Sequence, residues 1–367
     1  MKFTCEVKEL YEVVSGVSLA VAAKSTLPVL EGILLRCQGN HLTLSAYNLD
    51  LGIRKTIPVS GEENGELVVS ARMFSDILRK LSGDILTFVS DEKMLIHLSC
   101  GGTEFTMLGM SSEEFPLLPD IESIGRLQMP QGLLKNMIGQ TIYAVAVNEA
   151  IPVITGTLFD IEDGILHMVS VDGYQLAMRK EAVDTPDHFR FVVPGKTLSE
   201  ISKLLKEDDE EKIDINVGKN HVQFSLSGYE VISRLLEGKF LDYKASISEE
   251  TVTRVKVSKR LFSQSIDRAS ILISERIKSH IRCDFKAEEI SLSCVTAMGK
   301  IFDAIPADVI GPNLAIGFSN RYMLGALRAA DTDEVILEMK DAVSPIRILP
   351  PEGDSFLFLV LPWRIKE

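Results

Sequence analysis

The sequence predicts an α+β protein in which one unit occurs three times in tandem. Three observations lead to this prediction: a segment recurs at a fixed spacing, each copy holds two amphipathic helical patterns, and alternating strand patterns lie around them. Each unit is predicted to run strand, helix, several strands, helix, several strands, with its two helices packed on mostly antiparallel sheets. We place the three domains at residues 1–125, 126–249 and 250–367, with polar joins between them.

The recurring segment is a turn followed by alternating apolar residues. Its central residues, Leu42, Leu166 and Ile290, lie 124 residues apart at both steps. A period this long marks whole domains, because solenoid repeats that share a core are only 20 to 50 residues long. A chain of 367 residues is also long for a single core and suits two or three domains.

A first helical pattern precedes each recurring segment. We expect its apolar anchors to be Leu10, Leu133 and Leu261. After the segment comes a short strand and a second helix, and alternation then returns at residues 85–89, 213–217 and 335–339. A period of two is typical of strands with one buried face.

The second helix of each unit carries a basic pair opposite its apolar stripe. The stripes consist of Phe74, Ile77, Leu78 and Leu81, then Leu198, Ile201 and Leu205, then Met323 and Leu327. The opposite faces carry pairs of basic residues spaced seven apart, namely Arg72 with Arg79, Lys196 with Lys203, and Arg321 with Arg328. Any one such pair fits an ordinary solvated face. Three copies with the same spacing and sign predict contact with one polyanion, through its phosphates and without reading of bases.

Composition points to a cytoplasmic protein. The N-terminus lacks the apolar run of a signal peptide, and the apolar stretch at 356–361 is too short to span a membrane. Five cysteines without a CxxC pair fit reduced thiols better than a disulfide framework. A net charge of −13 argues against nucleic acid on its face, but the arrangement of the charges decides the partner.

Motifs of catalysis and of cofactor binding are missing from the sequence. It has no GxxxxGK[ST], GxGxxG, HExxH or GxSxG, and its six histidines are scattered. The acidic run 207–211 fits a polar turn better than a metal site, and Asp172 fits a turn residue better than a general base. We therefore expect no catalytic residue, no metal and no cofactor.

Three further motifs lead to a family. The order of the three repeats, together with KSTLPVL at 24–30, DGYQLA at 172–177 and LPWR at 361–364, resembles the bacterial DNA sliding clamp, the β subunit of the replicative DNA polymerase III. The resemblance covers the whole chain. It implies the DNA clamp fold, with six domains of a head-to-tail homodimer closed into a ring around double-stranded DNA.

The resemblance also implies a function and partners. The ring would be a processivity factor that slides along DNA and tethers the replicative polymerase and other replication and repair proteins, without being an enzyme. A clamp-loader ATPase would open it, and no membrane would be involved. Spheres the size of these domains, about 35 Å across, leave a hole of about 5 Å when three touch in a ring and about 35 Å when six do. Only the second admits a DNA duplex, so two chains would be needed.

Site residues follow from the same resemblance. The positions matching DNA contacts are Lys24, Arg72 and Lys196. The positions matching a partner-peptide pocket are Ile154, Val171, Gly173, Tyr174, Leu176, Leu241, Val360, Leu361, Pro362, Trp363 and Arg364. The dimer interface would place Phe105 and Met107 of one chain against Ile271 and Leu272 of the other. Many relatives have His-Arg in place of Tyr174-Gln175 and Pro in place of Leu241, which bears on peptide preference.

Two other classes stay open on the residues alone. An enzyme could assemble its site from scattered residues, in which case a cleft would hold a cluster of perturbed acidic or His groups. A scaffold or DNA mimic could use the acidic surface and never meet DNA. Residues 356–359 read as a buried edge strand, whereas the residues after Pro362 read as part of the pocket.

Overall fold

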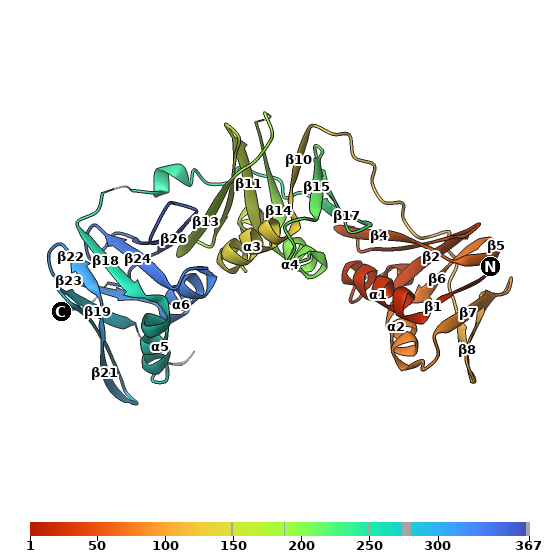
Figure 1. Cartoon of the computed structure of the whole chain (residues 1–367), viewed down its shortest axis with the longest axis horizontal. Coiled ribbons are helices and arrows are strands. Elements are labelled where there is room, and N and C mark those ends of the chain that lie inside the picture. The colour runs from red at the N-terminus through yellow and green to blue at the C-terminus, as the bar shows by residue number, and fades with distance from the viewer. Residues whose placement is uncertain (148–149, 187, 249, 274–279, 365–367) are drawn as a thin grey trace. The chain divides into compact units, whose positions relative to one another are not determined.

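The computed structural model describes residues 1–147, 150–186, 188–248, 250–273 and 280–364. The elements follow the predicted order three times, each time as strand, helix, strands, helix, strands (Figure 1). The six α-helices of the described residues are α1 (Val7–Val17), α2 (Ala71–Lys80), α3 (Gln131–Thr141), α4 (Gly195–Leu204), α5 (Lys259–Ser270) and α6 (Asn320–Ala329). Every strand pair between described strands is antiparallel, for example β1 with β7 and β13 with β26. The α+β prediction is confirmed.

The chain forms two compact units that do not follow the sequence repeat. The first unit comprises Met1–Gly132 and Glu200–Leu235, and the second comprises Leu133–Ser199 and Leu236–Glu367. The division falls close to the start of α3 and within α4, so strands of the central repeat are shared between the units. The boundaries 125/126 and 249/250 therefore stay predictions about the repeat.

The first unit contains two sheets. Its five-stranded sheet has the order β5 (Ser60–Glu63), β1 (Lys2–Glu6), β7 (Ile85–Ser90), β8 (Leu95–Cys100), β9 (Thr103–Leu108). Its eight-stranded sheet has the order β10 (Gly125–Pro130), β15 (Lys212–Val217), β16 (His221–Leu226), β17 (Tyr229–Arg234), β4 (Leu51–Pro58), β3 (His41–Tyr47), β2 (Gly32–Gln38), β6 (Gly65–Ser70). The pairing of β17 with β4 joins strands of the first and central repeats into one sheet.

The second unit repeats this arrangement. Its nine-stranded sheet has the order β14 (Phe189–Pro194), β11 (Gly156–Glu162), β12 (Ile165–Val171), β13 (Gln175–Ala182), β26 (Phe356–Val360), β25 (Ile346–Leu349), β24 (Glu334–Met339), β18 (Thr253–Ser258), β22 (Asp308–Ile310). Its four-stranded sheet has the order β21 (Gly299–Pro306), β20 (Glu289–Thr296), β19 (Ile281–Lys286), β23 (Leu314–Phe318).

Short 3₁₀ turns of the two units lie at Ser18–Ala20, Pro28–Glu31, Ile142–Ala144, Pro152–Thr155 and Lys244–Ser246.

The helices lie on the sheets by one apolar face, as their periodicity predicts. In the first unit α1 lies beside α2 (Figure 1), and Phe74 of α2 meets Phe88 edge to face. Phe88 in turn stacks on Phe3 with ring centroids 4.8 Å apart. The hydroxyl of Ser70 accepts a hydrogen bond from the Met73 amide at 3.5 Å, so a side chain caps the start of α2.

Two of the three predicted anchors of the first helices are displaced by one residue. Leu10 is fully buried in α1, but Leu133 and Leu261 are only half-buried. The buried residues at the fourth position of α3 and α5 are Leu134 and Phe262. The first helices themselves were predicted correctly, but in these two the predicted anchor precedes the fully buried position by one residue, about 100° around the helix.

Candidate functional site

The first member of each basic pair occupies the same place in its helix. Arg72, Lys196 and Arg321 are each the second residue of α2, α4 and α6, and all three side chains are exposed. Within the part of the chain that the structure describes, none of the three lies close enough to an acidic side chain to form an ion pair. A cation in the first turn of a helix is unfavourable next to the positive end of the helix dipole. Three such residues are therefore better explained by an anionic ligand than by helix stability.

The second member of each pair is neutralised by a nearby carboxylate. Arg79 lies 2.6 Å from Asp76, and Lys203 lies 2.6 Å from Glu200, both one helical turn earlier. Arg328 lies 3.6 Å from Asp267 of the neighbouring helix α5. The structure thus separates the six residues, equal in the sequence, into a free set and a paired set. Lys24 is exposed in the loop before the turn at Pro28–Glu31.

Four of the predicted peptide-pocket residues, Ile154, Val171, Leu176 and Leu241, gather on one face of the nine-stranded sheet in the second unit. Val171 and Leu176 are buried there in one apolar cluster with Leu357 and Leu359 of β26. Ile154 and Leu241 pack against the same cluster but keep part of their surface exposed. A half-buried apolar rim over a buried apolar floor suits the aliphatic or aromatic side chains of a peptide.

A tight loop presents Tyr174 at the edge of this cluster. Asp172 accepts hydrogen bonds from the Tyr174 and Gln175 amides at 2.9 and 3.0 Å, and Gly173 has a φ of 91°. Residues with a Cβ atom are strained in this conformation, which explains why glycine occupies position 173. Tyr174 is 60% exposed and stacks on Tyr322 of α6, with ring centroids 5.7 Å apart. The loop therefore holds an aromatic surface open to solvent, and Asp172 is confirmed as a turn residue.

Gln175 is turned away from solvent. Its amide nitrogen donates to the Asp172 carboxylate at 3.0 Å and to the Tyr143 carbonyl at 3.3 Å. Its side-chain oxygen is buried and has no hydrogen-bond partner in the described residues. Gln175 thus supports the loop from behind and leaves Tyr174 as the residue that a ligand can touch.

The C-terminal tail crosses from this cluster to the four-stranded sheet. The Leu361 amide donates to the Tyr174 carbonyl at 2.9 Å, and the Trp363 amide donates to the Gly317 carbonyl at 2.7 Å. Trp363 is 50% exposed, and its ring stacks on His280 with centroids 6.2 Å apart. Pro362 is half-buried between these two bonds, and Arg364 is exposed. The tail after β26 is thus tied by its backbone and presents part of an aromatic face.

The prediction of an edge strand just before this tail is wrong in one respect. Phe356–Val360 forms β26, which is fully buried but lies between β13 and β25 in the interior of the sheet. Phe356, Phe358 and Val360 face one apolar cluster, and Leu357 and Leu359 face the other. Val360 therefore turns away from the predicted pocket floor. A run of five apolar residues fits this interior position, because both faces of the strand are covered.

The predicted dimer-interface residues differ in exposure. Ile271 is 82% exposed after the end of α5, and Leu272 is half-buried. Phe105 is half-buried on the edge strand β9, whereas Met107 is already 5% exposed within its own sheet. Met107 has little surface left to offer a partner. Sequence reasoning missed exposed apolar residues near another edge strand, β21: Val295, Met298 and Phe302.

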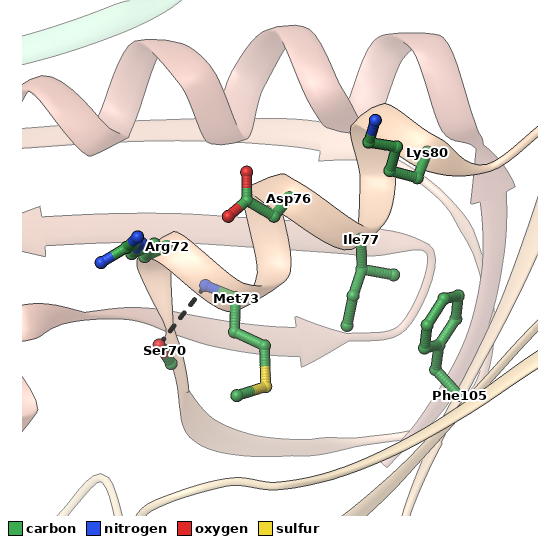
Figure 2. A pocket seen from close by; sticks show the side chains of 7 residues that line it. All are labelled: Ser70, Arg72, Met73, Asp76, Ile77, Lys80 and Phe105. Carbon is green, nitrogen blue, oxygen red and sulfur yellow. Dashed lines mark hydrogen bonds between the residues drawn. The ribbon is translucent and has the colours of Figure 1, made fainter.

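Phe105 also lines a cavity of about 400 Å³ beside α2. Figure 2 shows Met73 and Ile77 pointing from the helix into this space, with Phe105 facing Ile77 from the other side. Arg72, Asp76 and Lys80 also line it. The apolar side chains of Met73, Ile77 and Phe105 make it a site that can take an apolar side chain.

The described residues contain no group of three or more His, Cys, Asp or Glu that could hold a metal ion. Asp160, the most deeply buried carboxylate among the described residues, is paired with Arg190 at 3.1 Å and accepts a hydrogen bond from Tyr243 at 2.9 Å. Burial raises the pKa of Cys5 to about 12, and the five cysteines are buried thiols that form no disulfide. No described helix has the length and apolar character that a membrane crossing requires.

Comparison with known proteins accounts for these features together. The family profiles of the N-terminal, central and C-terminal domains of the DNA polymerase III β subunit match residues 1–119, 128–242 and 245–364. The β sliding clamp of Bacillus subtilis strain 168 is 34% identical over 377 residues, covering 99% of this chain and 100% of that protein.

Solved structures agree with the sequence matches. A DNA polymerase sliding clamp from Bacillus subtilis superposes with a TM-score of 0.96 at 33% identity, covering 100% of both chains. A putative DNA polymerase III β subunit from Eubacterium rectale gives 0.95 at 34% identity, covering 99% of both. The fold and the three domain matches define a DNA replication protein with the DNA clamp fold. The chain belongs to the family of bacterial β sliding clamps, the β subunits of DNA polymerase III.

Proposed function

We propose that two copies of this chain close head to tail into a ring of six domains around double-stranded DNA in the cytoplasm. The ring slides without sequence specificity and acts as a non-catalytic processivity factor. It tethers the replicative polymerase and other replication and repair proteins by short peptides, and a clamp-loader ATPase opens it. No cofactor takes part.

The free cations on the second helices carry this proposal. Arg72, Lys196 and Arg321 hold equivalent places in α2, α4 and α6 and lack ion-pair partners among the described residues, while the chain as a whole has a net charge of −13. An acidic protein that keeps three unneutralised cations at equivalent places concentrates its attraction for a phosphate backbone there. Lys24, Arg79, Lys203 and Arg328 are proposed to add to this attraction, the last three less strongly because carboxylates already face them.

Two unpaired sheet edges support the dimer. Strand β9 ends one sheet of the first unit and β21 ends a sheet of the second unit, and an unpaired edge is a template for pairing with another chain. The cavity beside Phe105 would take an apolar side chain such as Ile271 of a second copy. Exposed Phe302 and Leu108 would be covered by the same contact.

The apolar cluster around Val171 and Leu176, with its half-buried neighbours, supports the tethering role. We propose that a short peptide with bulky anchors lies over Val171 and Leu176, between Ile154 and Leu241 on one side and Tyr174, Leu361 and Trp363 on the other. Gly173 lets the loop approach the peptide, Pro362 and Arg364 continue the rim, and Val360 acts only through the position of β26.

Topological retention on DNA tests the whole proposal. The protein, labelled with a fluorophore, is loaded by a bacterial clamp loader with ATP onto nicked circular DNA and washed in high salt. A closed ring stays on the circle, because salt screens phosphate contacts but does not open the ring. Linearising the DNA should then release the protein. Loss during the salt wash, or a solution mass of one chain rather than about twice 40.6 kDa, contradicts the ring.

A further inference from the structure

One segment without regular strands covers the face of the nine-stranded sheet on which the proposed peptide groove lies. This cover segment, residues 236–247, places Phe240 and Tyr243 in the buried apolar cluster with only 7% and 2% of their surface exposed. Leu236, Leu241 and Ile247 pack against the same cluster. Apolar contacts alone hold such a segment without fixing its register, because the hydrophobic effect has no direction.

A buried hydrogen bond can fix the register of the cover segment on the sheet. The Tyr243 hydroxyl donates to one carboxylate oxygen of Asp160 on β11 at 2.9 Å, and Arg190 of β14 lies 3.1 Å from the other oxygen. Asp160 is only 4% exposed. Burial raises the pKa of Tyr243, and the bond to Asp160 raises it further, so the hydroxyl stays protonated and donates.

The remaining ties between the cover segment and these strands are few. The Leu236 amide donates to the Val192 carbonyl at 2.9 Å, at the start of the segment. Lys244 pairs with Glu162, but both side chains are about half exposed, and such pairs contribute little. Between residues 237 and 243 the segment's only hydrogen bond to the sheet that the structure describes is therefore that of Tyr243.

We propose that the Tyr243–Asp160 hydrogen bond is a positioning contact for peptide binding, because it sets where Leu241 stands over the groove. Leu241 lies two residues before Tyr243, and its half-buried side chain meets the same cluster as Val171 and Leu176. A buried carboxylate costs desolvation that an apolar pair would not. The desolvation of Asp160 is explained if its bond to Tyr243 holds the cover segment, and with it Leu241, in one register. The inference rests on the proposed peptide groove.

A conservative series tests this inference. A panel of labelled hexapeptides with Leu and Phe anchors is first screened against the wild type, and the tightest binder is kept. Its affinity for each variant is then measured by fluorescence anisotropy, far below the melting temperature. We expect Tyr243→Phe and Asp160→Ala each to weaken binding by about fivefold, the effect of one hydrogen bond. The double variant should be no weaker than Asp160→Ala alone, since that variant has already lost the hydrogen bond that Tyr243→Phe removes.

Matched variants separate positioning from general damage. Asp160→Asn keeps an oxygen that accepts from Tyr243, so its affinity should stay within about twofold of the wild type. Tyr229→Phe removes a hydroxyl bonded to the Glu12 carbonyl in the first unit and should change nothing. Unchanged affinity in Tyr243→Phe, additive losses in the double variant, or equal losses in Asp160→Asn and Asp160→Ala would each overturn the inference. Failure of the wild type to bind any peptide of the panel would instead contradict the proposed peptide groove.

Discussion

His167 shows how a single residue couples the folded state to pH. Its ring lies 6.4 Å from that of Tyr243, and one ring nitrogen is buried without a partner in the described residues. Burial lowers the pKa of His167, and the nearby carboxylate of Asp160 only partly opposes this. Burial likewise lowers the pKa of His221 and His280.

The direction of these shifts sets the sign of a pH effect. When the pKa of a histidine is lower in the folded state, protons bind more readily to the unfolded chain as the pH falls through about 6.5. We therefore expect the melting temperature to fall between about pH 7 and pH 5.5. In His167→Gln the free energy of unfolding should depend less steeply on pH, because the variant takes up a fraction of a proton less on unfolding. His41→Gln, at an exposed position, is the control, and an equal change in both variants would contradict the assignment to His167.

The second helices carry a prediction at the scale of elements. Replacing Arg72, Lys196 and Arg321 by Gln should weaken DNA binding and lower its salt slope by up to about 0.9 for each phosphate that is no longer neutralised. Sequence preference should not change, because interactions with phosphates carry no base information. The measurement is the binding constant of a short duplex over a range of salt concentrations.

The paired cations provide the matched control for these helices. Changing Arg79, Lys203 and Arg328 to Gln removes the same number of charges, each of which already faces a carboxylate. We expect a smaller loss of affinity and a smaller change of slope. Equal effects from the two triple variants would show that the ion pairs do not decide which helix residues meet DNA.

The tail after β26 carries the second prediction at this scale. Deleting residues 363–367 removes the Trp363 surface and its bond to Gly317 but leaves β26 and the bond from Leu361 to Tyr174. Peptide affinity should fall by at least tenfold, since an aromatic anchor contributes about 2 kcal/mol or more. The melting temperature, followed by calorimetry, should change by no more than a few degrees. A larger drop would mean that Trp363 belongs to the core.

Helix faces could be predicted from the sequence because their period is local, but strand order could not. The stripes of α2, α4 and α6 gave Phe74, Leu198 and Met323 as buried, and they are. The interior place of β26 depends on pairing with β13, about 180 residues earlier, which no local pattern records. The Asp160–Tyr243 bond also joins distant segments, and so it escaped prediction.

At the scale of the whole molecule, the strands of the central repeat are divided between two sheets, so the three sequence repeats are not three separate structural units. Strands β15 to β17 extend the sheet of the first repeat, and β11 to β14 extend the sheet of the third. The repeats are therefore joined by strand pairing as well as by linkers. The sheet edges β9 and β21, which lie in different units, stay unpaired within the described residues, and an unpaired edge is a template for pairing with another chain.

The dimer gives the last prediction. Changing Ile271 and Leu272 to Asp should leave the chain folded, because Ile271 is 82% exposed and Leu272 is half-buried. In the proposed interface the same charges would be buried without partners, which costs at least about 3 kcal/mol, or more than 100-fold in the dissociation constant. Analytical ultracentrifugation at micromolar concentration should then give the mass of one chain, 40.6 kDa. Val343→Asp, at an apolar residue 64% exposed elsewhere in the second unit, should stay dimeric. A double variant that remains dimeric would place the interface away from the end of α5.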